Sequence, residues 1–152
     1  MKVTYLAVFT EATHDERGFT VTFPDVSGAI TEGDTVEQAV AMAEDALGMM
    51  LCTYEDEGKP LPAPSTLEQI PLEGNQLVKP VSVDLDRHRQ IQRAIDSNPI
   101  RWAREHAGLN IKELSEYLGA PYRTVQDWNN GTNRPPRWCE KLIFDKIMEL
   151  KD

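Results

Sequence analysis

Side chains that can hydrogen-bond to the edges of DNA bases gather in one short segment near the end of the chain. Arg123 suits guanine O6 and N7, and Gln126 suits adenine, because each can form two hydrogen bonds to that edge in the major groove. For Tyr122 and Asp127, an ordinary solvated helix surface is an equal alternative. The segment predicts contacts with base edges or the flanking backbone from Tyr122, Arg123, Thr124, Gln126 and Asp127.

The residues after this segment carry a second kind of chemistry. Asn130, Thr132 and Arg134 can donate hydrogen bonds to phosphate oxygens, which position a protein on a duplex without reading its sequence. The net charge of −9 argues against a nucleic-acid partner only if it is taken over the whole chain. Residues 1–85 hold 4 basic and 15 acidic side chains, whereas residues 86–152 hold 12 basic and 10 acidic ones. The second part can therefore approach DNA, and the first part would be repelled by it.

A series of short helices from Pro99 onward is expected to position these side chains. Asn110 caps one helix, with Glu113 three residues on to complete a capping box, and Pro121 begins the next. The small Ser115 lets these two helices cross closely. Helix ends are marked by glycines where a left-handed residue belongs, namely Gly108, Gly119 and Gly131.

The run from Ile111 to Gly131, followed by Arg134-Pro135-Pro136, resembles the phage-repressor class of helix-turn-helix proteins, with Ser115 where that class usually has alanine. The resemblance implies that the second helix of the motif enters the major groove, and that the protein binds two half-sites as a dimer. A motif that mediates only protein contacts is the alternative. Trp128 and Trp138 are interpreted as core residues. The last helix is a candidate both for the core and for a dimer surface, through Trp138, Leu142, Ile143, Ile147 and Leu150.

The N-terminal part predicts an antiparallel sheet with one long helix. Alternation of apolar and polar residues indicates strands over residues 2–10, 19–23 and 28–32. A fourth strand, Leu77 to Leu85, contains Pro80, which favours a sheet edge because proline donates no ladder hydrogen bond.

The long helix begins at a cap formed by Asp34 or Thr35 and ends at Gly58, and an apolar stripe along it faces the sheet. Its methionines are interpreted as packing residues, namely Met42, Met49 and Met50.

Three motifs with fixed spacing lie between the second strand and this helix: Phe23-Pro24-Asp25, Gly28, and Gly33-Asp34-Thr35. Together with the later run from Asp56 to Pro62, they resemble the HicB-type antitoxin domain over residues 3 to 85. The resemblance implies a degenerate ribonuclease-H-like fold without catalysis. It also implies a small, basic HicA-type ribonuclease as partner, with a fold like that of double-stranded-RNA-binding domains. The acidic surplus fits such a partner, because complementary charge speeds association. The alternative is that the acidic residues only keep the protein soluble.

No pattern in the sequence predicts catalysis, a metal or a cofactor. Metal-dependent phosphodiester cleavage needs several carboxylates converging from different strands, and the first three strands hold no inward-facing acid within an apolar run. Asp25 and Asp34 are interpreted as turn and cap residues. Cys52 and Cys139 are interpreted as reduced thiols. The histidines lack zinc spacing and are interpreted as solvated, namely His14, His88 and His106.

The sequence thus predicts an α+β protein with a toxin-neutralising domain over residues 1–85, a connecting helical segment over 86–97 and an all-α DNA-binding domain over 98–152. The function expected is that of a type II antitoxin that inhibits a HicA-type toxin cleaving mRNA and represses its own operon. The alternative is a stand-alone transcriptional regulator whose N-terminal domain senses a ligand or mediates oligomerisation. We expect double-stranded operator DNA and a homodimer or higher oligomer as further partners. We also expect a cytoplasmic location, because no apolar run approaches the ~20 residues of a membrane span.

Overall fold

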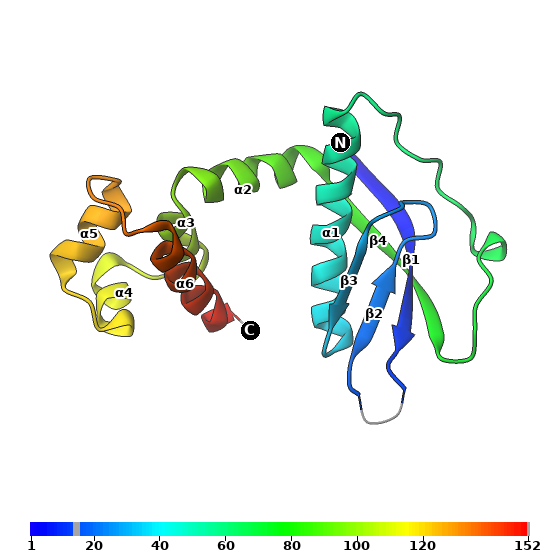
Figure 1. Cartoon of the computed structure of the whole chain (residues 1–152), viewed down its shortest axis with the longest axis horizontal. Helices are drawn as coiled ribbons and strands as arrows, with labels where there is room; N and C mark the ends of the chain where they lie inside the picture. Colours follow the sequence, from blue (N-terminus) through cyan, green and yellow to red (C-terminus); the bar gives the residue numbers. More distant parts are fainter. Residues whose placement is uncertain (14–15, 152) are drawn as a thin grey trace. The chain divides into compact units, whose positions relative to one another are not determined.

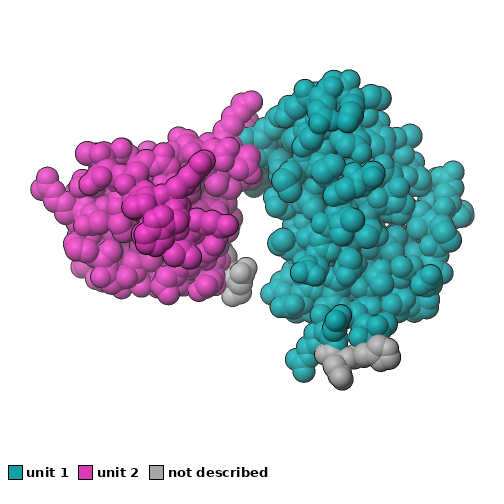
Figure 2. All heavy atoms as spheres, in the orientation of Figure 1, with its two compact units in different colours: residues 1–89 teal, residues 90–152 magenta. Residues whose placement is uncertain are grey.

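A computed structural model describes residues 1–13 and 16–151 of the chain. These residues form two compact units, residues 1–89 and residues 90–152 (Figure 2). His14, one of the histidines interpreted as solvated, lies outside the described residues.

The first unit is built on a four-stranded antiparallel sheet in the order β3-β2-β1-β4. The strands are β1 (Lys2–Glu11), β2 (Phe19–Thr22), β3 (Ile30–Gly33) and β4 (Gln76–Asp84). β4 is an edge strand in which Pro80 pairs with Leu6, as the proline predicted. The third strand runs from 30 to 33 rather than from 28 to 32, because Gly28 has a positive φ of 90° and still belongs to the turn.

Helix α1 (Val36–Asp56) covers one face of this sheet (Figure 1). Thr35 is its N-cap, and its Oγ1 accepts a hydrogen bond from the backbone N–H of Gln38 at 3.2 Å. The alternation predicted for β1 is confirmed, since its inward residues Tyr5, Ala7 and Phe9 are buried. They pack with Val21 and Val81 from the neighbouring strands and with α1 through Ala39, Ala43, Leu47 and Leu51.

Two of the helix methionines do not pack as the sequence predicted. Met50 lies against the core, but the side chains of Met42 and Met49 are 48% and 57% exposed. They lie on the outward face of α1, because the stripe that packs on the sheet is formed by Ala39, Ala43, Leu47 and Leu51.

The connection between α1 and β4 includes a short 3-10 helix, η1 (Leu67–Gln69), and is held by two side chains of the sheet layer. The Tyr5 hydroxyl donates to the carbonyl oxygen of Pro62 at 2.6 Å. The Asp25 carboxylate accepts a hydrogen bond from the backbone N–H of Ser65 at 2.7 Å. Asp25 therefore anchors a distant segment in addition to standing in a turn.

Helix α2 (Leu85–Ser97) begins in the first unit, where its first turn packs closely on α1. The imidazole of His88 lies against Gly48, so His88 is half-buried rather than fully solvated as predicted. Arg89 donates to the carbonyl oxygen of Cys52 at 3.1 Å and pairs with Asp56 at 2.9 Å.

The second unit contains the helices α3 (Pro99–His106), α4 (Ile111–Leu118), α5 (Tyr122–Asn130) and α6 (Arg137–Met148), followed by the 3-10 helix η2 (Glu149–Lys151). One residue or more from each of the four α-helices enters a small core formed by Ile100, Ala103, Leu114, Val125 and Ile147. The glycines predicted to end helices all have positive φ, at 73° for Gly108, 68° for Gly119 and 73° for Gly131.

The two tryptophans of this unit that were interpreted as core residues have different surroundings. Trp128 packs against the core. Trp138 is 69% exposed, so its prediction as a core residue is wrong. Its position on α6 faces away from the core, and Ile147 fills the core from the opposite face of the same helix.

Candidate nucleic-acid interface

The pair α4 and α5 is joined by three residues, Gly119 to Pro121. Asn110 and Glu113 form the expected capping box at the start of α4, with bonds of 2.8 and 3.0 Å. Ser115 is buried, and its Oγ donates to the carbonyl oxygen of Lys112 at 2.8 Å, so this small side chain satisfies its own polar group. The helix α5 begins at Tyr122, one residue later than predicted, because Pro121 itself is the N-cap.

The first turns of α5 present the side chains predicted to contact DNA bases. Tyr122 is 49% exposed and Arg123 is exposed, whereas Gln126 is half-buried. Within the described residues, no hydrogen bond or ion pair engages the side chains of Arg123 or Gln126. Their donors and acceptors are therefore available to a ligand. Thr124 and Asp127, the other residues predicted on this helix, are half-buried.

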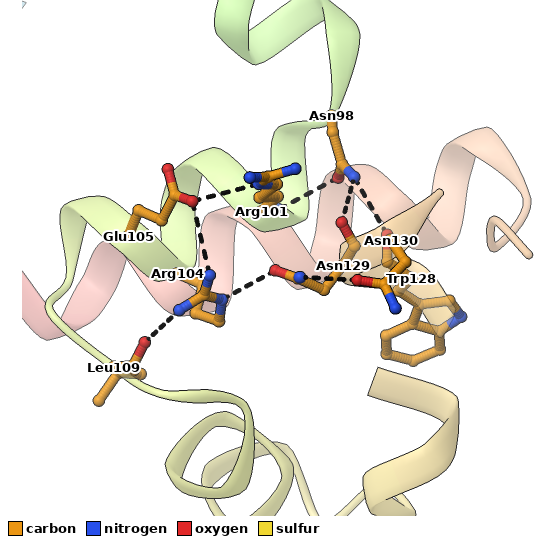
Figure 3. Close-up of polar contacts among 8 residues, drawn as sticks. All are labelled: Asn98, Arg101, Arg104, Glu105, Leu109, Trp128, Asn129 and Asn130. Atoms are coloured by element: carbon orange, nitrogen blue, oxygen red, sulfur yellow. Dashed lines mark hydrogen bonds and ion pairs between the residues drawn. The ribbon is translucent and has the colours of Figure 1, made fainter. Parts of the chain in front are cut away.

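A partly buried polar network fixes the other end of α5 (Figure 3). The Asn98 amide donates to the carbonyl oxygens of Trp128 and Asn129, both at 3.1 Å, while its Oδ1 accepts from the backbone N–H of Arg101 and caps α3. Arg104 donates to Oδ1 of Asn129 at 2.9 Å and to the carbonyl oxygen of Leu109 at 2.7 Å. This network ties α3 to α5 and thereby sets the direction in which α5 projects.

The residues predicted to contact phosphate lie after this network but are not equally available. Asn130 and Thr132 are exposed. The Arg134 guanidinium instead forms a two-pronged pair with Glu140, with bonds of 2.9 and 3.0 Å. Glu140 is buried, so this pair holds the turn before α6, and a phosphate would have to compete with it for Arg134.

Sequence reasoning missed Asn98, Arg104 and Asn129 as parts of this site. The sequence marked Asn98 only as the start of a helix. Arg104 and Asn129 are 25 residues apart in the sequence, and no local pattern marks a bond between residues so far apart.

Among residues 1–13 and 16–151, no cluster of three or more His, Cys, Asp or Glu side chains could hold a metal ion. Cys52 and Cys139 are free thiols, and burial raises the pKa of the Cys52 thiol. No described helix has both the length and the apolar character needed to cross a membrane.

The family of the chain is identified from its N-terminal part. Residues 5–98 match the family described as the HicB-like antitoxin of bacterial toxin-antitoxin systems, which is more than half of the chain. The chain belongs to the HicB-like antitoxins. The resemblance predicted from Phe23-Pro24-Asp25 and Gly33-Asp34-Thr35 is thereby confirmed for the N-terminal part.

Two known antitoxins of Photorhabdus laumondii subsp. laumondii share shorter segments with this HicB-like antitoxin. Antitoxin HicB 2 is 49% identical over 53 residues, which are 35% of this chain and 38% of that protein. Antitoxin HicB 1 is 40% identical over 55 residues, which are 36% of each chain. The chain therefore spans less than two fifths of the length of these relatives.

Among solved structures, a chain of a toxin-antitoxin complex from Streptococcus pneumoniae has a TM-score of 0.53 and 21% sequence identity. The likeness covers 78% of this chain and 98% of that chain. This likeness shows that the two chains share a fold.

Proposed function

We propose that this HicB-like antitoxin binds and inhibits a HicA-type ribonuclease through residues 1–85 and represses its own operon through residues 98–152, with residues 86–97 as the connection. The family match over residues 5–98 is the observation that carries the proposal. The charge of the N-terminal part supports it, since residues 1–85 contain 15 acidic side chains and only 4 basic ones. A ribonuclease must present a basic face to its RNA, and an acidic domain can cover that face.

The second unit supports the DNA-binding part of the proposal. On helix α5, the side chains of Arg123 and Gln126 have no partner among the residues that the structure describes, and the far end of the helix is fixed by Asn98 and Arg104. A rigidly held helix of this size fits the major groove. We assign base or nearby backbone contacts to Tyr122, Arg123, Thr124, Gln126 and Asp127, and phosphate contacts to Asn130, Thr132 and Arg134.

The proposed repressor binds DNA as a dimer, and helix α6 is the surface proposed for dimerisation. Trp138 and Leu142 stand one turn apart on its outward face and are 69% and 61% exposed. An apolar groove of about 540 Å³ adjoins Trp138, with Pro99 and Phe144 in its lining. Two copies packed antiparallel can insert the Trp138 of each into the groove of the other, which is the self-complementary pattern that a two-fold interface requires.

The proposed activity involves no catalysis by this chain. It acts as an inhibitor by covering the toxin and as a repressor by occupying DNA.

Co-expression of the full chain with its neighbouring genes tests the antitoxin part. The tagged chain should co-purify with a small basic ribonuclease, and the complex should not cleave RNA until the two proteins are separated. A ribonuclease that does not co-purify, or an operon that encodes none, would contradict the proposal. That result would favour a stand-alone transcriptional regulator.

A further inference from the structure

The outward face of α1 is unusual for a surface helix in both its charge and its exposed side chains. Val36–Asp56 contains five acidic residues and no lysine or arginine. Solvated helix faces usually mix both signs, because pairs of opposite charge three or four residues apart stabilise the helix. This helix has no such pair available to it.

The acids near the two ends of α1 differ in whether they form ion pairs with the rest of the first unit. Near its C-terminus, Glu55 and Asp56 pair with Arg89 at 3.2 and 2.9 Å. In the earlier turns, Glu37, Glu44 and Asp45 have no ion pair with any described residue. The unneutralised charge is therefore confined to the first part of the helix.

Two exposed apolar side chains lie on the outward side of α1, next to one of these acids. Met42 and Met49 are seven residues apart, so they lie on the same side of the helix about 10 Å from each other. Asp45 falls between them on that side, and the small Ala41 next to Met42 leaves room for an approaching backbone. Single exposed apolar residues are ordinary on protein surfaces. Two aligned methionines with Asp45 between them instead combine an adaptable apolar anchor with a directed charge. Glu37 and Glu44 lie about 120–160° round the helix from the methionines, at the other edge of its exposed side.

We propose that this methionine face, formed by Met42, Asp45 and Met49 and bordered further round the helix by Glu37 and Glu44, is the surface of the antitoxin that binds the ribonuclease toxin. The inference rests on the proposed function and names the part of the first unit that carries it. The partner it fits is a basic, phosphate-binding protein surface with shallow apolar pockets. The carboxylates take the place of RNA phosphates, and the two thioethers fill the pockets.

The methionines and the acids have separable roles. Fully desolvated apolar anchors determine the lifetime of a complex. Replacing Met42 and Met49 should therefore increase the dissociation rate. Charges at the rim steer encounter, so Glu44 and Asp45 act on the association rate, and their effect weakens with salt.

The test measures binding between the full chain and the ribonuclease encoded in its operon, by surface plasmon resonance at low and high ionic strength. Met42→Gln/Met49→Gln keeps side-chain length and helix propensity while removing the apolar character. Glu44→Lys/Asp45→Lys reverses the charge. The matched controls carry the same kinds of change elsewhere in the first unit: Leu67→Gln/Leu72→Gln, at residues 57% and 43% exposed, and Glu68→Lys/Glu73→Lys.

The methionine variant should weaken binding about tenfold or more, mainly through faster dissociation. The charge variant should slow association about tenfold at low salt and less at high salt, with both controls staying within about twofold of wild type. Circular dichroism should show unchanged helix content for all four variants, and Met42→Ala/Met49→Ala provides a second truncation if the glutamine variant fails to fold. A wild-type chain that binds, with α1 variants that bind equally well or controls that are equally impaired, would overturn this surface and leave the antitoxin function intact. A wild-type chain that does not bind would overturn the proposed function itself.

Discussion

Arg104 and Asn129 connect two helices of the second unit through a bond that is largely shielded from water. Nε of Arg104 donates to Oδ1 of Asn129 at 2.9 Å, and Nη1 of the same side chain donates to the carbonyl oxygen of Leu109 at 2.7 Å. One guanidinium thus holds α3, the turn before α4 and the end of α5 in a fixed relation. The direction of the proposed DNA-reading helix depends on it.

Arg104→Met should lower the free energy of unfolding by about 2–3 kcal/mol, because it leaves the acceptors on Asn129 and Leu109 without their charged donor. Urea denaturation measures this loss. Arg101→Met is the matched control: its pair with Glu105, at 3.1 Å, is an exposed contact one turn along the same helix. It should change stability by no more than about 0.5 kcal/mol. Equal losses in both variants would contradict the special role of Arg104.

Gly48 should not tolerate alanine, although alanine is the better helix former. A Cβ at this position would stand 2.5 Å from Nδ1 of His88, so either the ring or the start of α2 must move. Gly48→Ala should therefore destabilise the protein by about 1–3 kcal/mol, which is typical of overpacking. The double variant Gly48→Ala/His88→Ala should recover part of the loss in thermal unfolding. A single variant more stable than wild type would show that the close approach carries no constraint.

Asp84 gives the first turn of α2 a pH-dependent stability. The backbone N–H of Arg87 and that of Asp86 donate to its Oδ1 at 3.2 and 3.1 Å. The Arg87 bond first, and then the nearby N-terminal amino group, lower the pKa of this carboxyl below its ordinary value of 3.8. Because the pKa is lower in the folded state, the stabilisation is complete above the unfolded pKa and disappears as the pH falls through the folded one.

Asp84→Asn should accordingly lower the melting temperature at pH 7. The difference from wild type should shrink below the ordinary pKa of the carboxyl, 3.8, and vanish in stronger acid. Melting curves across this range measure it. A difference that stays constant down to strong acid would contradict the assignment to the charged form.

The proposed dimer surface on α6 predicts a change in assembly with little change in fold. Trp138→Ala/Leu142→Ala removes two side chains that are 69% and 61% exposed, so the second unit should keep its helices. Sedimentation velocity should show a dimer for wild type and a shift to monomer for the variant. A wild-type monomer, or a variant that remains a dimer, would place the interface elsewhere.

Local patterns predicted most of the framework because they reflect contacts close in sequence. The alternation through Tyr5, Ala7 and Phe9 placed the buried face of β1, and Asn110 with Glu113 marked the start of α4. The edge position of β4 was predicted from Pro80, because proline has no backbone N–H to donate to a neighbouring strand.

The predictions that proved wrong depended on which side of a helix its neighbours cover. Met42, Met49 and Trp138 are apolar and sit in amphipathic helices, yet each faces outward because smaller or better placed residues complete the core. Residue type alone could not show this. The pairing of Arg134 with Glu140 likewise depends on the path of the chain through Pro135 and Pro136, which places two residues six apart in contact.

Arg123→Ala should separate the two proposed activities. Loss of a two-pronged contact to guanine should weaken binding to the operator by about 1–3 kcal/mol. Inhibition of the ribonuclease should be unchanged, since Arg123 lies in the second unit and the proposed toxin surface lies in the first. Gel-shift titrations with promoter DNA measure the first effect. A parallel fall in both activities would contradict the division of labour.

The central claim is that this chain inhibits a ribonuclease by binding it. The most direct measurement is the rate at which the purified operon-encoded ribonuclease cleaves RNA as the full chain is added. We expect cleavage to stop near one equivalent of antitoxin, and to do so equally with wild type and with Arg123→Ala. Cleavage that continues at the same rate in a large excess of the wild-type chain would contradict the account.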